Sequence, residues 1–173
     1  MDDWEKKLSE ISVATSDYTD EELPEALGSL LNSIRDTLKM DVVFVAKFED
    51  GHRKFMAVDS APDHNIIQRG MSDPLEESWC HRIVQGRLPE LIRDGKMLIA
   101  GGRVPYTPLE IGTHLSVPVV RPDGTVYGTL CTFAFHVDNR IDQQDVERLR
   151  QTSRLLASRL GADPGKKHPE RPS

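Results

Sequence analysis

The sequence contains few cysteines, no long apolar run and no basic leader. Its only cysteines, Cys80 and Cys131, are not part of a CxxC motif. Two cysteines cannot form a disulfide framework, so free thiols in a reducing compartment are expected. No apolar run approaches the ~20 residues of a membrane span, and the amino terminus, MDDWEKKLSE, does not read as a secretory signal. We therefore expect a cytoplasmic protein that does not associate with membranes.

Clustered basic residues are also lacking. The 22 Lys and Arg residues are outnumbered by 28 Asp and Glu residues, which gives a net charge of −6, and the single basic cluster, GKKHPERPS, ends the chain. Because binding to phosphate backbones needs Lys and Arg gathered on one face, nucleic acid is not expected as a partner. With 38% apolar and 29% charged residues, the 173-residue chain has the composition of one ordinary globular domain.

Helices are predicted near both ends of the chain. Residues 2–12 fit a short helix, and residues 24–39 carry leucines and isoleucine at three- and four-residue intervals, which is typical of one buried helical face. The last helix is predicted to begin at Asp142, with Ile141 and Val146 placed for a hydrophobic staple. Its apolar residues follow a near-heptad seam that fits packing on the domain or on a second copy. The seam consists of Val146, Leu149, Leu156 and Leu160.

Two β-hairpins are predicted from paired runs of β-branched and aromatic residues. The first run, DVVFVAKFEDGHRKFMAV, turns at Asp50-Gly51, where glycine tolerates a positive φ. The second hairpin joins THLSVPVV to TVYGTLCTFAF through RPDG. Within it, Gly128 indicates a bulge or a close backbone approach.

The segment between the hairpins is predicted to hold a helix, a short strand and a long loop. In DPLEESWCHRIVQGRLP, Asp73 is the expected N-cap, Pro74 the first helical residue, and Gly86 lies just past the end. A short strand then ends at Asp94, which we expect to cap the following turn. Residues 94–112 form a long Gly- and Pro-containing connection, and loops of this length are usually functional or mobile.

This order of elements predicts an α+β domain with one central antiparallel sheet. We divide the chain into a helical or irregular extension over residues 1–22, a single domain over residues 23–161, and a disordered tail over residues 162–173. The tail is predicted from its Pro-rich, polar composition.

The sequence resembles the GAF family of small-molecule sensor domains. The segments that carry the resemblance are LEESWCHRIVQGRLP, GRLPELIRD with its aspartate after a short strand, and VPVVRPDGTVYGTLCTFAF before a closing helix. The resemblance implies a sheet of about five to six strands. The N- and C-terminal helices would pack on one face of it, and the middle helix and the long loop on the other.

The resemblance also implies a function. GAF domains bind cyclic nucleotides, tetrapyrroles or other metabolites, and their first and last helices commonly form a dimer that passes a signal on. We therefore expect a non-enzymatic sensor that binds a small ligand, forms a homodimer through its terminal helices and signals to a separate partner protein. Neither the ligand nor a cofactor is identified by the sequence.

The adjacent Cys80 and His81 are the first candidates for reactive chemistry. Neighbouring helical residues point about 100° apart, so Cys80 faces inward with Trp79 while His81 faces outward. A Cys–His nucleophile pair needs side chains within hydrogen-bond reach of each other. The pair is therefore not expected to be catalytic, and Cys80 is expected to line either the core or a ligand pocket.

Two GAF-related chemistries depend on a thiol elsewhere in the fold. Bilin-binding photoreceptors and free-methionine-sulfoxide reductases carry their thiol in the segment before the second hairpin, which here is YTPLEIGTHLSVP and contains no cysteine. Cys80 falls near another reductase cysteine, but thiolate chemistry needs an accessible nucleophile and a resolving partner. Both functions are kept as alternatives to the sensor, and no catalytic residue is assigned.

A zinc site in this chain would draw on Cys80, His114, Cys131 and His136. These residue types are zinc ligands, but no two of them form a short-spaced pair. His136 follows Cys131 by five positions, which puts the two on opposite faces of a strand. No metal site is therefore predicted.

Ligand contacts are expected where the long loop meets the sheet. A cleft with an aromatic side chain and a few convergent polar groups is the usual form of a small-molecule site. The candidate ligand-binding residues are Trp79, Cys80, Arg103, Tyr106, Thr107 and His114.

Overall fold

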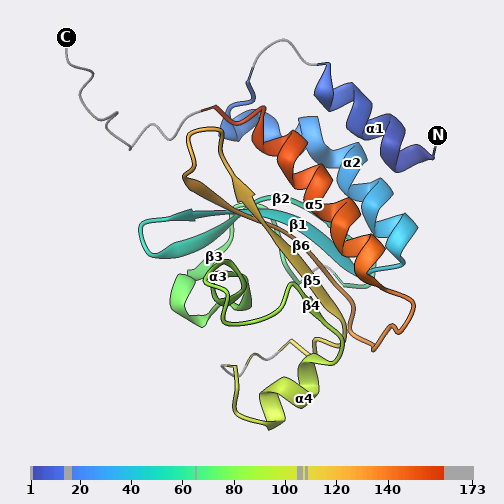
Figure 1. Cartoon of the computed structure of the whole chain (residues 1–173), viewed down its shortest axis with the longest axis vertical. Helices are drawn as coiled ribbons and strands as arrows, with labels where there is room; N and C mark the ends of the chain where they lie inside the picture. Colours follow the sequence, from blue (N-terminus) through green and yellow to red (C-terminus); the bar gives the residue numbers. More distant parts are fainter. Residues whose placement is uncertain (1, 14–16, 65, 105–106, 108, 162–173) are drawn as a thin grey trace.

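The computed structural model describes residues 2–13, 17–64, 66–104, 107 and 109–161 (Figure 1). Its helices are α1 (Asp3–Ser12), α2 (Leu23–Leu38), α3 (Trp79–Val84), α4 (Gly95–Ala100) and α5 (Gln143–Ala157), with short 3₁₀ helices at Asp20–Glu22 and Leu75–Glu77. Its strands are β1 (Val42–Glu49), β2 (His52–Ser60), β3 (Ser72–Pro74), β4 (Leu91–Ile92), β5 (His114–Val120) and β6 (Val126–Phe133). The predicted tail, residues 162–173, lies outside the described residues. No described helix is long and apolar enough to span a membrane.

The described strands form one antiparallel sheet of six strands in the order β3-β2-β1-β6-β5-β4. Figure 1 shows α1, α2 and α5 on one side of the sheet, and α3 and α4 on the other. The expected α+β architecture is thus confirmed, with terminal helices on one face and the middle helix on the opposite one.

The alternation of side chains along β1 builds two apolar cores, one on each face of the sheet. Val43 and Val45 belong to the core beneath α1, α2 and α5, which we call the helix-face core. Val42, Phe44 and Ala46 belong to the core beneath α3 and the long loop, which we call the pocket-face core. Successive residues of a strand point to opposite faces, so a single strand contributes to both cores.

The apolar seam of α5 is used within its own domain. Val146, Leu149 and Leu156 are buried in the helix-face core, and Leu160 packs against it. Asp142 caps the helix by accepting hydrogen bonds from the backbone N–H groups of Gln144 and Asp145, as its position predicts. The seam therefore packs on its own domain in this structure.

The central strands approach each other closely at Gly128. A Cβ atom there would collide with the carbonyl oxygen of Ala46 on β1. The predicted close backbone approach is therefore confirmed, and glycine is required here because it lacks a Cβ atom.

The middle helix is shorter than predicted. It begins at Trp79 with Ser78 as its N-cap, because the Ser78 hydroxyl accepts a hydrogen bond from His81 N at 3.0 Å. The proposed cap, Asp73, lies instead on β3, where its carboxylate pairs with Arg53. Gly86, with φ of 75°, does lie just past the end of the helix.

The long connection is not a loop throughout. Its first part is α4, whose N-cap is Asp94, with the Asp94 carboxylate accepting a hydrogen bond from Met97 N at 3.3 Å. Asp94 thus caps the turn that follows β4, as expected. The remaining described residues of the connection, 101–104, 107 and 109–112, have no regular structure.

Candidate functional site

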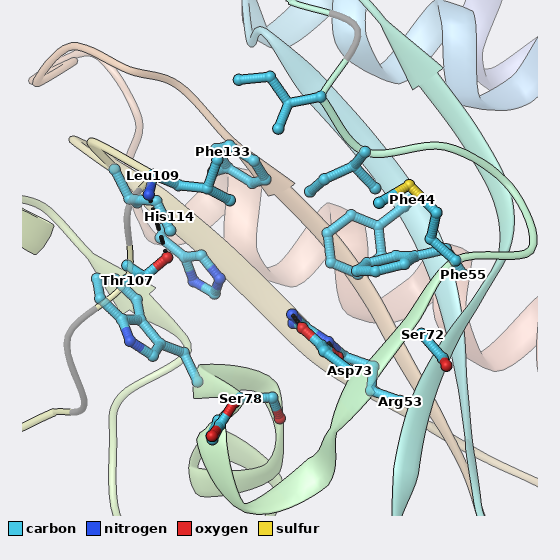
Figure 2. Close-up of a pocket in the computed structure, with 16 residues that line it drawn as sticks. Phe44, Arg53, Phe55, Ser72, Asp73, Ser78, Thr107, Leu109, His114 and Phe133 are labelled. Atoms are coloured by element: carbon cyan, nitrogen blue, oxygen red, sulfur yellow. Dashed lines mark hydrogen bonds and ion pairs between the residues drawn. The ribbon is translucent and has the colours of Figure 1, made fainter.

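A cavity of about 350 Å³ lies on the pocket face of the sheet. Strands β1, β2, β5 and β6 form its floor, and α3 and the long connection lie across it (Figure 2). The described residues that line it are Phe44, Arg53, Phe55, Ile66, Ile67, Met71, Ser72, Asp73, Glu77, Ser78, Trp79, Thr107, Leu109, Ile111, His114 and Phe133. The volume is at the lower end of the ~300–1,000 Å³ typical of small-molecule sites.

The predicted ligand-binding residues divide into four cases. Trp79, Thr107 and His114 line the cavity. Cys80 is completely buried beside it and does not form part of its lining. Arg103 is exposed on the surface and does not line the cavity. Tyr106 lies outside the described residues.

Aromatic rings form much of the cavity wall. Phe44 and Phe55 meet edge to face with their ring centroids 4.8 Å apart. The His114 ring lies 5.5 Å from that of Trp79 and is stacked on that of Phe133 at 6.4 Å. Such a wall suits a flat, partly apolar ligand, because aromatic pairs favour edge and offset-stacked contacts.

His114 presents an unused polar atom in this aromatic surrounding. Its side chain is buried, and its Nε2 atom lies 3.3 Å from Cys131 Sγ. Within the described part of the chain, its Nδ1 atom has no hydrogen-bond partner. A buried polar atom without a partner costs free energy, so a ligand that hydrogen-bonds to Nδ1 would remove that cost.

Arg53 and Asp73 form the charged side of the cavity. The Arg53 guanidinium donates to both carboxylate oxygens of Asp73, from Nε at 3.0 Å and from Nη2 at 2.6 Å. Its Nη1 atom donates to Cys80 Sγ at 3.3 Å, and the guanidinium lies 4.9 Å from the Phe55 ring centroid. Burial alone would lower the pKa of Arg53, but the neighbouring Cys80 and Asp73 raise it, so the group stays charged.

Neither Arg53 nor Asp73 was predicted as a site residue. A signal was present for Arg53, since it occupies the same face of β2 as the buried Phe55, two positions later. A charged side chain on the inward face of a strand needs a partner. That its partner is Asp73 depends on the pairing of β2 with β3, which brings Arg53 opposite Asp73.

The two cysteines and His114 converge next to the cavity. The potential ligand atoms of Cys80, His114 and Cys131 all lie within 4.8 Å of one another, and all three side chains are buried. Strand register explains this: Cys131 on β6 lies opposite Ser116 on β5, and His114 is two residues before Ser116 on the same face. The first turn of α3 supplies Cys80, to whose sulfur the Ser116 hydroxyl donates at 3.7 Å.

The two thiols differ in acidity. A hydrogen bond from Cys131, together with the nearby Arg53 guanidinium, lowers the pKa of Cys80 well below its usual value. Burial and the negative charge on Cys80 raise the pKa of Cys131. Of the two thiols, Cys80 is therefore the more acidic and Cys131 the less acidic.

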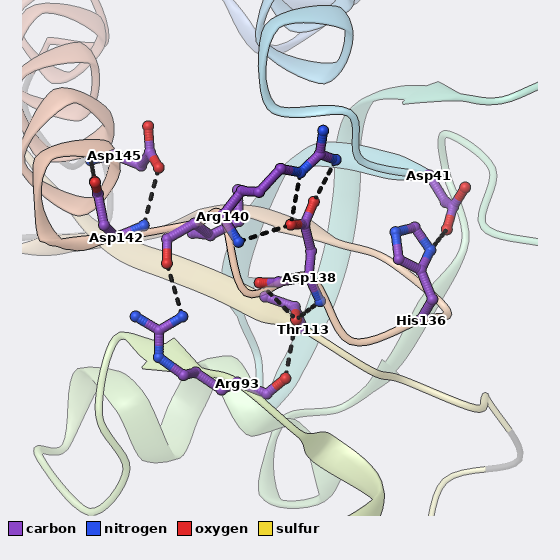
Figure 3. A network of polar contacts seen from close by, with 9 residues as sticks. Asp41, Arg93, Thr113, His136, Asp138, Arg140, Asp142 and Asp145 are labelled. Carbon is purple, nitrogen blue, oxygen red and sulfur yellow. Dashed lines mark hydrogen bonds and ion pairs between the residues drawn. The ribbon is translucent and has the colours of Figure 1, made fainter.

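His136 does not join this cluster. Its Nδ1 atom lies 3.8 Å from an oxygen of Asp41, as Figure 3 shows. The prediction placed His136 on the same strand as Cys131, which is wrong, because β6 ends at Phe133 and His136 lies beyond it. The other three candidate zinc ligands, Cys80, His114 and Cys131, do lie together.

A second polar network connects the long connection to the start of α5 (Figure 3). The Thr113 hydroxyl donates to the Arg93 carbonyl at 2.9 Å and accepts from the Asp138 N–H at 2.7 Å. The Arg93 side chain donates to the carbonyl of Ile141 at 2.8 Å, next to the cap of α5. Thr113 lies two residues after the cavity-lining Ile111, so the network connects the segment next to the cavity with the segment that leads into α5.

Comparison with known proteins gives a family match, and the similar solved structures include GAF domains. A family model described as GAF domain matches residues 20–160. No curated protein sequence matches the chain. Solved structures match it over most of its length at low sequence identity.

One similar structure is the GAF domain of the Acinetobacter phosphoenolpyruvate-protein phosphotransferase. It has a TM-score of 0.70 and 18% identity, covering 91% of this chain and 89% of that one. A phycoerythrobilin-bound GAF domain from a cyanobacterial phytochrome has a TM-score of 0.64 and 14% identity, over 91% and 94% of the two chains.

A third similar structure is the type II free methionine-R-sulfoxide reductase from Thermoplasma acidophilum. Its TM-score is 0.63 at 17% identity, over 82% of this chain and 94% of that one. At these identities the three structures establish a common fold, while the chemistry of each depends on its own side chains.

Proposed function

This chain belongs to the GAF domain family, and on that premise we propose that it is a non-enzymatic sensor that binds a small ligand in the cavity beside α3. The observation that carries the proposal is the buried His114 Nδ1 atom, which has no partner within the described residues and belongs to a cavity-lining side chain. Cyclic nucleotides and other metabolites with a flat ring fit the aromatic wall. The modest cavity volume of about 350 Å³ favours these over a tetrapyrrole.

The charges of the lining favour a ligand that is close to neutral in its buried part. The Arg53 guanidinium is already paired with Asp73, and Glu77 adds a second carboxylate to the wall. A ligand group that is both flat and able to hydrogen-bond to an imidazole therefore suits the site better than a phosphate placed deep within it.

The signal would pass from the long connection to α5. Thr107, Leu109 and Ile111 line the cavity, and Thr113 hydrogen-bonds to the segment that leads into α5. A ligand that moves these residues would alter the start of α5, and α5 with α1 and α2 is where a homodimer and a separate signalling partner would bind. The apolar seam of α5 is buried within the domain, so such contacts would use its outer, mostly polar surface.

The test combines ligand detection with a cavity-filling variant. Purified full-length protein is examined by intact mass and absorption for a bound molecule. Its melting temperature is then measured with cyclic GMP, cyclic di-GMP, biliverdin and free methionine sulfoxide. A molecule that binds the folded state raises the melting temperature, and the rise grows with the logarithm of its concentration relative to Kd.

Thr107→Trp should abolish that rise because it fills the cavity, whereas Glu110→Trp places the same bulk on an exposed position of the same segment and should leave it unchanged. Strictly monomeric protein, no co-purifying molecule and no shift with any of these compounds would reject the sensor.

A thiol-dependent reductase is the second candidate, because Cys80 and Cys131 lie together and Cys80 has a lowered pKa. Against it, both thiols are completely buried. If the protein were such a reductase, it would turn over free methionine sulfoxide with a thiol reductant and lose that activity in Cys80→Ser. Absence of turnover in the wild type would remove this candidate. A bilin photoreceptor would be recognised by the absorption and intact mass of a covalent adduct.

A further inference from the structure

We propose that Cys80, His114 and Cys131 form a binding site for one thiophilic d¹⁰ cation, Zn²⁺ or Cu⁺, buried beside the ligand cavity. The site goes beyond the sensor function and does not depend on it. It consists of side chains from three elements, α3, β5 and β6, which the fold holds in place without a metal.

The spacing of the donor atoms suits such an ion. Zn–S bonds of ~2.3 Å and Zn–N bonds of ~2.0 Å at tetrahedral angles place the ligand atoms about 3.5–3.8 Å apart. Here the Cys131 Sγ to His114 Nε2 distance is 3.3 Å, and the three ligand atoms lie within 4.8 Å of one another. An ion at the centre of the cluster therefore requires only small side-chain movements.

The donor types point to the same class of ion. Two thiolates and one imidazole form a soft donor set, which selects Zn²⁺ and Cu⁺ over Mg²⁺ and Ca²⁺. Three protein ligands suit three-coordinate Cu⁺, or Zn²⁺ with a fourth position held by water or a small molecule.

The surrounding charges permit a buried cation. Arg53 is the positive group nearest to the cluster, with its Nη1 atom 3.3 Å from Cys80 Sγ, but it is bound to the carboxylate of Asp73. Two thiolates neutralise Zn²⁺, so the metal-bound cluster adds no net charge to the interior. Binding would release the thiol protons that the two cysteines carry, since the metal ligand is the thiolate.

His114 can serve the metal and the cavity at once. Its Nε2 atom faces Cys131, and its Nδ1 atom is left without a partner in the described residues. A metal at Nε2 fixes the proton on Nδ1, which then becomes a hydrogen-bond donor. Metal-ligating histidines commonly use their second nitrogen in this way.

The first experiment titrates reduced, chelator-treated full-length protein with Co²⁺ as a spectroscopic probe of the zinc site. Thiolate ligation is expected to give a sulfur-to-cobalt charge-transfer band at one Co²⁺ per chain, and Zn²⁺ is expected to displace it. Cu⁺ is tested separately by anaerobic competition with a chromophoric chelator. Wild-type protein that shows no such band and binds neither Zn²⁺ nor Cu⁺ overturns the proposal.

Variants identify the ligands. Cys131→Ser should weaken Zn²⁺ binding by more than about 100-fold, since even the loss of an outer partner costs roughly 10- to 100-fold. His136→Gln is the matched control, because His136 is the candidate ligand that lies elsewhere, and it should bind Zn²⁺ as the wild type does. Equal affinities of the two variants would refute the assignment.

A further measurement on the wild type avoids any folding defect of Cys131→Ser. X-ray absorption at the zinc edge should show two sulfur scatterers and one imidazole nitrogen, whereas a shell of oxygen and nitrogen alone would contradict the site. Reduced protein that binds none of these ions, but forms an intramolecular disulfide with hydrogen peroxide, would show that the thiols are a redox pair instead.

Discussion

At the scale of single residues, Arg53 joins three different groups of the candidate site. It binds both oxygens of Asp73, donates to Cys80 Sγ and packs on the ring of Phe55. Its side chain is 13% exposed, whereas that of Asp73 is 37% exposed. Losing Arg53 would therefore leave the partly solvated Asp73 carboxylate without its cation and the buried Cys80 sulfur without its hydrogen-bond donor.

Replacing Arg53 by Met should lower the free energy of unfolding by about 3 kcal/mol, the lower end of what breaking a buried ion pair costs, because Asp73 retains access to water. Urea unfolding measures this change. Lys54→Met, an exposed position on the same strand, should change stability by less than about 0.5 kcal/mol. Equal effects of the two substitutions would show that the Arg53 contacts do not stabilise the fold.

Single residues also show why the site was only partly predictable. The inward direction of Cys80 follows from helical periodicity, which is local, and the structure buries it completely. Cys80 lies on α3, whereas its neighbours Arg53, Ser116 and Cys131 lie on three different strands. Their convergence depends on strand register, which no local pattern in the sequence specifies.

At the scale of elements, the connection between β6 and α5 is held by a carboxylate. Asp138 is buried and accepts hydrogen bonds from the backbone N–H of Arg140 at 2.9 Å and from its Nε and Nη2 atoms at 3.0 and 2.9 Å. These contacts, with the Arg140 side chain first, lower the pKa of Asp138. The connection should therefore lose stability in acid.

The direction of this pH dependence follows from the difference between the folded-state and unfolded-state pKa values of Asp138. A lowered pKa in the folded state gives stabilisation that is present above the unfolded-state value of ~3.9 and is lost as the pH falls through the folded-state value. Asp138→Asn should be less stable than the wild type at pH 7 and at pH 5, and the difference should shrink below pH ~4. Urea midpoints across this range measure it. A difference as large in strong acid as at neutral pH would contradict the role of the carboxylate, and Arg140→Met should move the acid loss to higher pH.

The elements differ in how well local sequence predicts them. The cap of α5 at Asp142 was predicted correctly because its hydrogen bonds go to Gln144 and Asp145 nearby. The cap at Asp73 was wrong, although DPLEE has the expected residues, because the carboxylate is used by Arg53 twenty positions earlier. A favourable tertiary ion pair thus outweighed a local capping preference.

The whole molecule has two apolar cores that share one sheet. Trp4 lies on the helix face, where its indole N–H donates to the Thr152 hydroxyl at 3.0 Å, and Trp79 lies in the pocket-face core. Since β1 supplies residues to both cores, neither can melt without loss of the central strands. The two tryptophans should therefore report one cooperative transition.

The single-tryptophan variants Trp4→Phe and Trp79→Phe test this cooperativity. In each variant, the urea midpoint from the remaining tryptophan's fluorescence should coincide with the midpoint from far-UV circular dichroism. Two separate midpoints in the Trp4→Phe variant would instead mean that the pocket face unfolds on its own. The α+β class followed from element order and the sides on which the helices pack from the family resemblance, while the cavity and its lining required the three-dimensional structure.

The short strands β3 and β4 have a consequence for assembly. They flank the described sheet, with three and two residues respectively, and β3 is tied to β2 by the Arg53–Asp73 pair. A growing cross-β aggregate needs a long row of free backbone N–H and C=O groups as a template. Edge strands as short as β3 and β4 present few such groups. Edge-to-edge pairing is thus hindered where β3 and β4 cover their neighbours β2 and β5.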